Sequence, residues 1–422
     1  MRIIQDIFDI LRNKKKIKIV KNKAYKWEKR SKKYKKTLRK TLKNNGKIKV
    51  AFLIMFATST QDYGIFEMML KSDIFDPYII ANPDISRSRE NFEINYNKTV
   101  KEMTEKYGAD RVLKGYDYET DSYTDYTSDF DMMFTNNPYD HMANENFRIK
   151  YWTEKNIPVC YISYFYMGRC KITTWNLKRP EASMFWKFFV ENNYVKKLAK
   201  KHQKIHGKNI VVTGYPKLDE LAKIKKEEHS RKRIILAPHH SINIDLFASF
   251  FDYCDTLLKL PEKYPDIDFI FRPHPLLIQN LKKEEFWGEE KTEEYLNNLL
   301  NHKNITYSTE GDYFDLFINS DGMFHDCGSF MAEYLCTDHP CAFFLGKNVD
   351  VKNTFLEFGI KCLDNHYICK SEEDIYDFID NVVIKGDDPK KEERNRFAKE
   401  KIMINYPNAT KCIYENIVKE LK

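Results

Sequence analysis

Polar side chains gather at three points in the second half of the sequence, each directly after a short apolar run. Residues 237–241 read Ala-Pro-His-His-Ser, residues 271–275 read Phe-Arg-Pro-His-Pro, and residues 325–329 read His-Asp-Cys-Gly-Ser. Imidazole, guanidinium and hydroxyl groups suit a diphosphate, because they donate hydrogen bonds or carry positive charge. The sequence therefore predicts an anion site. Its predicted members are His239, His240, Ser241, Arg272, His274, Gly328 and Ser329.

The last of these points is a tight turn before a predicted helix. Gly328 is expected to permit the sharp turn, and Ser329 to cap the helix. The N–H groups at a helix start, together with the helix dipole, favour an anion. Glu333 lies four residues after Ser329, so the two side chains share one helix face.

Alternating strands and helices are expected to position these turns. The pattern is typical of a doubly wound parallel sheet, in which ligands bind at the carboxyl ends of the strands. The three turns should therefore meet at one edge. The predicted strands of this half are 234–237, 267–271, 305–307, 323–324 and 342–345, with helices at 247–260, 293–300 and 374–383.

The first half repeats the pattern before a charged linker at residues 223–232. Its predicted strands are 49–56, 76–81, 130–136, 159–164 and 210–213, with helices at 91–107 and 185–202. We therefore expect an α/β protein with two Rossmann-like domains facing a cleft, the GT-B arrangement. The predicted parts are a basic arm (1–46), an acceptor domain (47–228), a nucleotide-donor domain (229–385) and a C-terminal helix that packs back across both domains (386–422).

Composition limits the function classes. A chain of 422 residues fits two domains, and no apolar run is long enough to span a membrane. Nine cysteines without a CxxC pair indicate reduced thiols in the cytosol. The glycine-rich dinucleotide fingerprint is absent, and the Asp-x-Asp triplets at 129–131 and 266–268 precede their strands, away from the expected cleft. We predict no cofactor and no metal.

Positive charge is concentrated in the basic arm. Residues 1–47 hold 19 Lys and Arg but only Asp6, Asp9 and Glu28, whereas the rest of the chain is net acidic. Apolar residues recur at helical spacing in the first dozen positions, beside this polybasic tract. Such a segment suits the anionic inner face of the cell membrane, so we expect peripheral attachment there. A solvated helix and a nucleic-acid arm are the alternatives, but no nucleic-acid module follows, so no nucleic-acid partner is predicted.

Four motifs, in this order and rough spacing, resemble the CDP-glycerol glycerophosphotransferase family. They are Gly-Tyr-Pro-Lys-Leu-Asp at 214–219, Ala-Pro-His-His-Ser at 237–241, Arg-Pro-His-Pro at 272–275 and Asp-Cys-Gly-Ser-Phe-Met-Ala-Glu at 326–333. The resemblance covers about residues 47–385 and includes capsule-locus members of the family. These GT-B-like enzymes build teichoic acids and related capsular polymers.

The resemblance implies roles for individual residues. His274 would contact the donor diphosphate and support departure of the nucleotide, and Ser329 would hold the same diphosphate. His239 or Ser241 would line the donor pocket. Glu333 would meet the ribose, or else lie on a solvated helix face.

The first half departs from the family pattern. Teichoic acid polymerases carry there a His-Gly pair whose His is a candidate base for the acceptor hydroxyl. The comparable stretch here, residues 161–168, contains no His. We predict Asp62 as the substitute base and His141 as the second choice, because a carboxylate within reach of a hydroxyl suffices. The alternative for Asp62 is a turn or helix-cap carboxylate.

The expected function is transfer of glycerol- or ribitol-phosphate from a CDP-linked donor to a lipid-linked or polysaccharide acceptor. Three alternatives stay open. Two keep the fold, namely a nucleotide-sugar glycosyltransferase and a non-hydrolysing sugar epimerase, although an epimerase needs no membrane arm. The third is a non-catalytic scaffold at the membrane, which the missing first-domain His favours.

Overall fold

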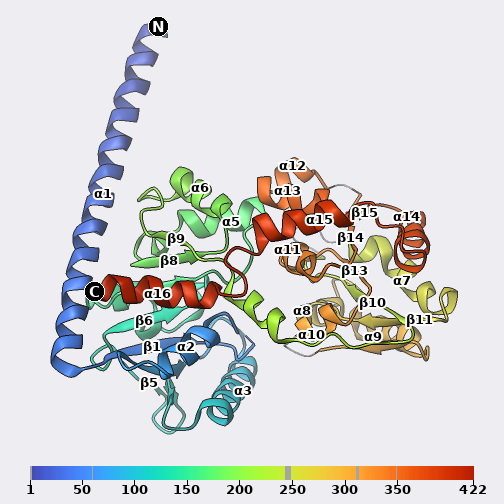
Figure 1. Cartoon of the computed structure of the whole chain (residues 1–422), viewed down its shortest axis with the longest axis horizontal. Coiled ribbons are helices and arrows are strands. Elements are labelled where there is room, and N and C mark those ends of the chain that lie inside the picture. The colour runs from blue at the N-terminus through green and yellow to red at the C-terminus, as the bar shows by residue number, and fades with distance from the viewer. Residues whose placement is uncertain (1, 59, 243–248, 310–312, 348) are drawn as a thin grey trace. The chain divides into compact units, whose positions relative to one another are not determined.

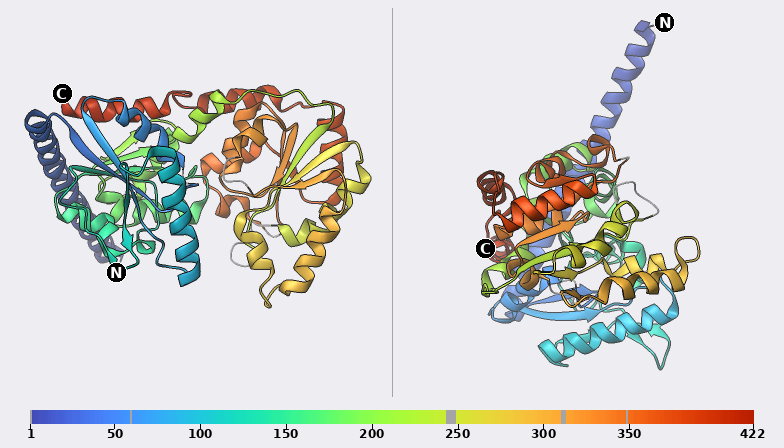
Figure 2. Two further views of the ribbon diagram at one scale, coloured as in Figure 1. Left: turned by 90° about the horizontal axis from the view of Figure 1, so that it is seen from below. Right: turned by 90° about the vertical axis from the view of Figure 1, so that its right-hand side faces the viewer.

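The chain folds into two compact units. A computed structural model describes residues 2–58, 60–242, 249–309, 313–347 and 349–422. Unit 1 comprises Met1–Tyr164, Thr174–Asp219 and Asn408–Lys422, and unit 2 comprises Phe165–Thr173 and Glu220–Pro407. Each contains a parallel sheet with helices packed against it (Figures 1 and 2), and unit 1 also holds an antiparallel pair of short strands, β4 (Tyr116–Asp117) and β5 (Ser122–Tyr123). The α/β class is as predicted, while the domain boundaries given above stay predictions.

Unit 1 contains a seven-stranded sheet in the order β3-β2-β1-β6-β7-β8-β9, and every pairing is parallel. The continuous apolar run is β1, an interior strand between β2 and β6, and Phe52 on this strand stacks on Phe134 with ring centroids 4.9 Å apart. The strands are β1 (Ile48–Ile54), β2 (Phe75–Ala81), β3 (Val112–Lys114), β6 (Met132–Thr135), β7 (Val159–Ile162), β8 (Lys187–Val190) and β9 (Ile210–Val212). The main helices are α1 (Arg2–Asn45), α2 (Tyr63–Leu70), α3 (Arg89–Tyr107), α4 (Ile149–Glu154), α5 (Cys170–Lys178, shared with unit 2), α6 (Asn193–His202) and α16 (Ala409–Leu421).

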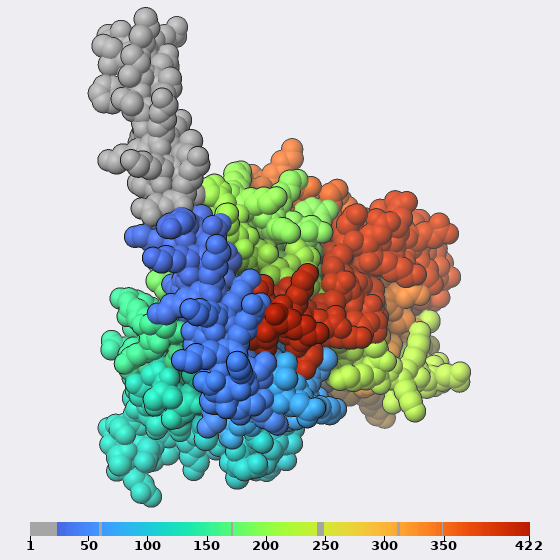
Figure 3. All heavy atoms as spheres, turned by 60° about the vertical axis from the view of Figure 1, so that its left-hand side comes forward, coloured from blue at the N-terminus to red at the C-terminus, as the bar shows by residue number. Residues whose placement is uncertain are grey.

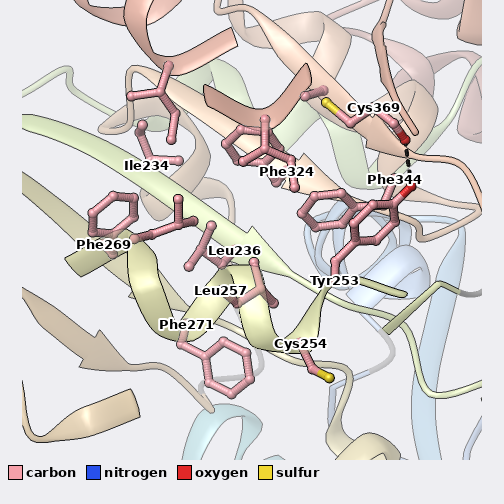
Figure 4. Close-up of a cluster of buried hydrophobic side chains, with 14 of the residues drawn as sticks. Ile234, Leu236, Tyr253, Cys254, Leu257, Phe269, Phe271, Phe324, Phe344 and Cys369 are labelled. Atoms are coloured by element: carbon pink, nitrogen blue, oxygen red, sulfur yellow. Dashed lines mark hydrogen bonds between the residues drawn. The ribbon is translucent and has the colours of Figure 1, made fainter. Parts of the chain in front are cut away.

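Unit 2 contains a six-stranded parallel sheet in the order β12-β11-β10-β13-β14-β15. Its core is aromatic, with Phe324 stacked on Phe344 at 5.3 Å and the Tyr253 hydroxyl donating to the Cys369 carbonyl at 2.8 Å (Figure 4). The strands are β10 (Lys232–Ala237), β11 (Ile267–Phe271), β12 (Ile305–Tyr307), β13 (Gly322–His325), β14 (Cys341–Phe344) and β15 (Tyr367–Cys369). The helices include α7 (Phe250–Lys263), α8 (Pro275–Leu281), α9 (Gly288–Leu300), α10 (Phe314–Ile318), α11 (Phe330–Glu333), α12 (Val351–Thr354), α13 (Glu357–Asp364), α14 (Glu372–Asp377) and α15 (Lys391–Phe397).

Several predicted elements differ from the structure. The segment 185–202 is not one helix, because strand β8 occupies its start and α6 begins only at Asn193. The last helix is interrupted before α16, where Pro407 has no N–H to continue a helix. The helix predicted at 247–260 begins at Phe250, and residues 247 and 248 lie outside the described part of the chain.

The basic arm is a helix that is partly built into unit 1. Ala24, Tyr34 and Leu38 of α1 are buried, the Trp27 indole N–H donates to the Phe185 carbonyl at 2.9 Å, and α1 runs beside α16 (Figure 3). The apolar face predicted in the first dozen residues lies outside the side chains that the structure describes. Within the described chain, no helix combines the length and apolar character needed to cross a membrane.

Candidate functional site

Three neighbouring strands bring the predicted polar turns to one edge of the unit 2 sheet. β10 lies between β11 and β13, and Leu236 pairs with Phe271 while Ala237 pairs with His325. The three strands therefore end almost in register. The His274 N–H also donates to the Pro238 carbonyl at 2.9 Å, which links two of the turns directly.

His239, His240 and His274 form one cluster of half-buried rings, which we call the imidazole cluster. The ring centroids of His239 and His274 are 5.1 Å apart, and those of His240 are 4.3 and 4.1 Å from the other two. The structure thus brings together the three histidines that the strand-end argument selected.

Backbone hydrogen bonds set the tautomers of two of these rings. The Ser241 N–H donates to His239 Nδ1 at 3.2 Å, and the Leu276 N–H donates to His274 Nδ1 at 3.1 Å. A ring nitrogen that accepts a hydrogen bond carries no proton, so each neutral ring keeps its proton on Nε2. The ring nitrogens lie within 4.8 Å of one another, as metal ligands would. However, Nε2–H groups are donors, which fit an anion and not a cation.

Burial disfavours the protonated form of every ring in the imidazole cluster. Burial lowers the pKa of His274 to about 3, and burial with the neighbouring rings holds the pKa of His239 well below its usual value. Burial also lowers the pKa of His240. An arriving diphosphate supplies the negative charge that favours protonation of a ring, so the cluster can take up a proton as it binds an anion.

Asp326 is a buried residue that joins two parts of the site. Its carboxylate accepts hydrogen bonds from the His239 N–H at 2.6 Å, from the Ser249 N–H at 2.8 Å and from the Ser249 hydroxyl at 3.1 Å. Burial raises its pKa to about 6 despite these bonds. The motif drew attention to Ser329, but Asp326 is the residue that holds the His239 backbone in place.

Replacing Asp326 by Ala is expected to lower the free energy of unfolding by roughly 2–5 kcal/mol, because two buried donors and one partly buried donor lose their acceptor. Urea denaturation at neutral pH measures the loss. The matched control is Asp268→Ala, since Asp268 pairs with Arg231 at the amino end of the sheet and its side chain is 39% exposed. The control should lose less than about 1 kcal/mol. Equal, small losses in both variants would contradict the role of Asp326.

Two buried histidines support the same turn. His325 Nδ1 accepts from the Cys327 N–H at 3.1 Å, His325 and His366 share a hydrogen bond between their Nε2 atoms at 3.1 Å, and His366 Nδ1 lies 2.7 Å from the Cys362 carbonyl. Only one pair of neutral tautomers satisfies all three bonds. His325 donates from Nε2, and His366 accepts at Nε2 and donates from Nδ1. This series of three hydrogen bonds fixes the start of the 325–329 turn.

One detail predicted for that turn, the Ser329 cap, is wrong. Ser329 makes no side-chain cap to the following helix, and α11 is only four residues long, so its dipole is small. Gly328 does not have a positive φ. Its missing side chain matters for a different reason: a Cβ there would lie 3.1 Å from Cδ of Arg169. Whether Gly328, Ser329 and Ser241 contact the donor stays a prediction.

Arg272 and Glu333 are linked through Tyr313. The Tyr313 hydroxyl donates to Glu333 Oε2 at 2.6 Å, and the Arg272 guanidinium lies 5.2 Å from the centre of the Tyr313 ring. Arg272 also donates to the Ser308 hydroxyl at 3.0 Å. Glu333 is buried, so the alternative of a solvated helix face is wrong. Its contact with a ribose stays a prediction.

The two candidate bases belong to unit 1. Asp62 ends a short 3-10 helix (Thr60–Asp62) before α2, has no exposed surface, and neither carboxylate oxygen has a hydrogen-bond partner among the described residues. Burial raises its pKa to about 8. It makes no side-chain cap to α2, so the helix-cap alternative is wrong. His141 lies exposed on another short helix, Asp140–Met142.

A known protein family matches a large part of the chain. The profile of the family described as CDP-glycerol:poly(glycerophosphate) glycerophosphotransferase matches residues 167–419, which is more than half of the chain. None of the curated protein sequences matches the chain.

Solved structures share the fold at low sequence identity. The wall teichoic acid polymerase TagF soaked with CDPG is 15% identical, with 99% of this chain and 98% of that chain covered and a TM-score of 0.57. A putative UDP-N-acetylglucosamine 2-epimerase from Listeria monocytogenes is 14% identical, with coverages of 89% and 97% and a TM-score of 0.56. MnaA from S. aureus with UDP is 12% identical, with coverages of 89% and 97% and a TM-score of 0.57. The predicted two-domain GT-B-like fold is confirmed.

Proposed function

Because this chain belongs to the CDP-glycerol:poly(glycerophosphate) glycerophosphotransferase family, we propose that its imidazole cluster binds the diphosphate of a CDP-linked polyol donor. The observation that carries this proposal is the pair of backbone N–H groups that fix His239 and His274 as Nε2–H donors. Donors held in place before the ligand arrives cost little reorganisation when charge develops on the phosphate oxygens.

The reaction is a displacement at phosphorus. The acceptor hydroxyl oxygen forms a bond to the phosphorus that carries the polyol, and the bond from that phosphorus to the bridging oxygen breaks. CMP leaves with the electron pair, and the hydroxyl proton passes to a base. His274 donates a hydrogen bond from Nε2 to the departing phosphate, where negative charge accumulates.

Asp62 is our candidate for that base, and the acceptor is a lipid-linked or polysaccharide hydroxyl. A carboxyl with a pKa of about 8 is a stronger base, once ionised, than an ordinary aspartate. Because Asp62 has no exposed surface, an acceptor hydroxyl can reach it only if the surrounding residues move.

Donor turnover tests the proposal. The full-length protein is incubated with CDP-glycerol, CDP-ribitol or UDP-N-acetylglucosamine, with and without a detergent-solubilised polymer acceptor, and nucleotide release is measured. We expect acceptor-dependent CMP release from a CDP-polyol and no reaction of the UDP sugar. Epimerisation of the UDP sugar without CMP release would refute the proposal, and failure to bind any of the nucleotides would favour the scaffold alternative.

The membrane is the further partner that we propose. Residues 1–22 contain seven Lys and Arg, and nine basic residues farther along α1 are exposed. These nine are Lys23, Lys26, Lys29, Lys32, Lys33, Lys36, Arg39, Lys40 and Lys43. Basic groups near an anionic lipid surface contribute about 1 kcal/mol each.

Removal of residues 1–22 is expected to abolish most co-sedimentation with vesicles that contain phosphatidylserine. The deletion ends before Ala24, the first residue of α1 whose side chain is described as buried, so unit 1 keeps its contacts with the helix. Neutral phosphatidylcholine vesicles are the control and should bind neither protein. Equal pelleting of the full and shortened chains with anionic vesicles would end the membrane proposal for this segment.

A further inference from the structure

A short segment from the first half of the sequence is fastened to unit 2. Phe165–Thr173 belongs to unit 2, whereas the chain on both sides of it belongs to unit 1. Arg169 forms an antiparallel bridge with Phe355, and the Leu356 N–H donates to the Gly168 carbonyl at 2.8 Å. A Cβ on Gly168 would lie 3.4 Å from the Gly359 Cα, so the two backbones are in close contact.

This attachment brings the Arg169 side chain to the donor turns. Its Cδ would lie 3.1 Å from a Cβ at Gly328, so the absence of a side chain at Gly328 makes room for the Arg169 stem. Its positive charge also reaches the imidazole cluster, where it adds to the larger effect of burial in lowering the pKa of His239 and His240. Arg169 is thus a cation beside the imidazole cluster.

We propose that Arg169 is a further binding residue for the donor diphosphate, supplied by the segment that lacks the family's histidine. This proposal rests on the proposed function of the imidazole cluster. A guanidinium group can donate two parallel hydrogen bonds to phosphate oxygens, and it stays charged while the imidazoles are neutral. Arg169 would then supply the permanent positive charge of the site.

Calorimetric binding of CDP and of cytidine to the full-length protein tests the proposal. Arg169→Gln should raise the Kd of CDP roughly 10- to 100-fold, the range of a lost charge-assisted hydrogen bond. The Kd of cytidine, which carries no phosphate, should change less than about twofold. Arg169→Lys keeps the charge and should recover part of the affinity.

Two matched variants separate the possible outcomes. Arg231→Gln makes the same change in unit 2, at an arginine paired with Asp268 before β10, and should bind CDP like the wild type. His274→Asn tests the imidazole cluster itself. If wild type binds CDP and His274→Asn weakens it, but Arg169→Gln stays within twofold, the Arg169 proposal alone is overturned. Equal weakening of CDP and cytidine would also overturn it, and a wild type that binds no CDP overturns the donor site as a whole.

Discussion

Replacement of His274 by Asn is expected to slow acceptor-dependent CMP release on the order of 100-fold and leave the fold intact. The Asn side-chain oxygen can take the place of Nδ1 and accept the Leu276 N–H bond that starts α8. Asn has no group at the position of Nε2, so the donor to the departing phosphate is lost. Loss of one such donor from other enzyme sites costs about 100- to 1,000-fold in rate.

Replacement of His274 by Gln separates the catalytic role of this side chain from its role as the cap of α8. Gln places an amide N–H near the position of Nε2 but leaves the Leu276 N–H without its acceptor. His274→Gln should therefore keep more activity than His274→Asn and lose about 1 kcal/mol of stability. Steady-state CMP release and urea denaturation measure the two effects.

The matched control is His229→Asn, because His229 is hydrogen-bonded to Asp321 ahead of β13, at the other end of the sheet. It should release CMP at the wild-type rate. A wild-type rate for His274→Asn would remove His274 from the mechanism, whatever its stability.

The sequence predicted the long strands better than the short ones. β1 stands out because it has seven residues and six of them are buried, so its apolar run is continuous. β3 and β15, with three residues each, were not predicted, whereas the equally short β9 and β12 were. The four residues of β8 were merged with the following helix, because Lys187–Val190 and Asn193–His202 together read as one periodic segment.

The residues of the candidate site could likewise be predicted only in part from the sequence. Strand-end geometry predicted that His239, His240 and His274 converge, because parallel neighbours end at one edge. Arg169 could not be found this way, since it follows β7 in the first half and reaches unit 2 through Gly168 and its contact with Gly359. No local pattern reveals that attachment. The hydrogen bonding of Asp326 likewise involves Ser249, 77 residues away in sequence.

Replacement of Asp62 by Asn is expected to remove a large pH dependence from the stability of unit 1. Burial raises the pKa of Asp62 to about 8 in the folded chain, against about 4 in an unfolded one. The folded state therefore binds more protons between these values, and the free energy of unfolding falls as the pH rises from about 4 to 8. Four pKa units correspond to about 5 kcal/mol.

Urea denaturation across this pH range compares wild type, Asp62→Asn and the exposed control Asp129→Asn. The wild type and the control should lose stability in parallel as the pH rises, and Asp62→Asn should lose about 5 kcal/mol less. Parallel curves for all three proteins would show that the carboxyl of Asp62 is ionised without penalty in the folded chain.

The rate of CMP release tests the second role of Asp62. A base with a pKa of about 8 gains its reactive form as the pH rises towards 8, so the wild-type rate should increase over the range in which stability declines. Asp62→Asn should lose roughly 100- to 10,000-fold in rate and show no such increase, because the amide cannot accept the proton. If Asp62→Asn is stabilised at high pH but keeps the wild-type pH dependence of CMP release, Asp62 is a buried acid and not the base. The base would then be another group, with His141 as the next candidate.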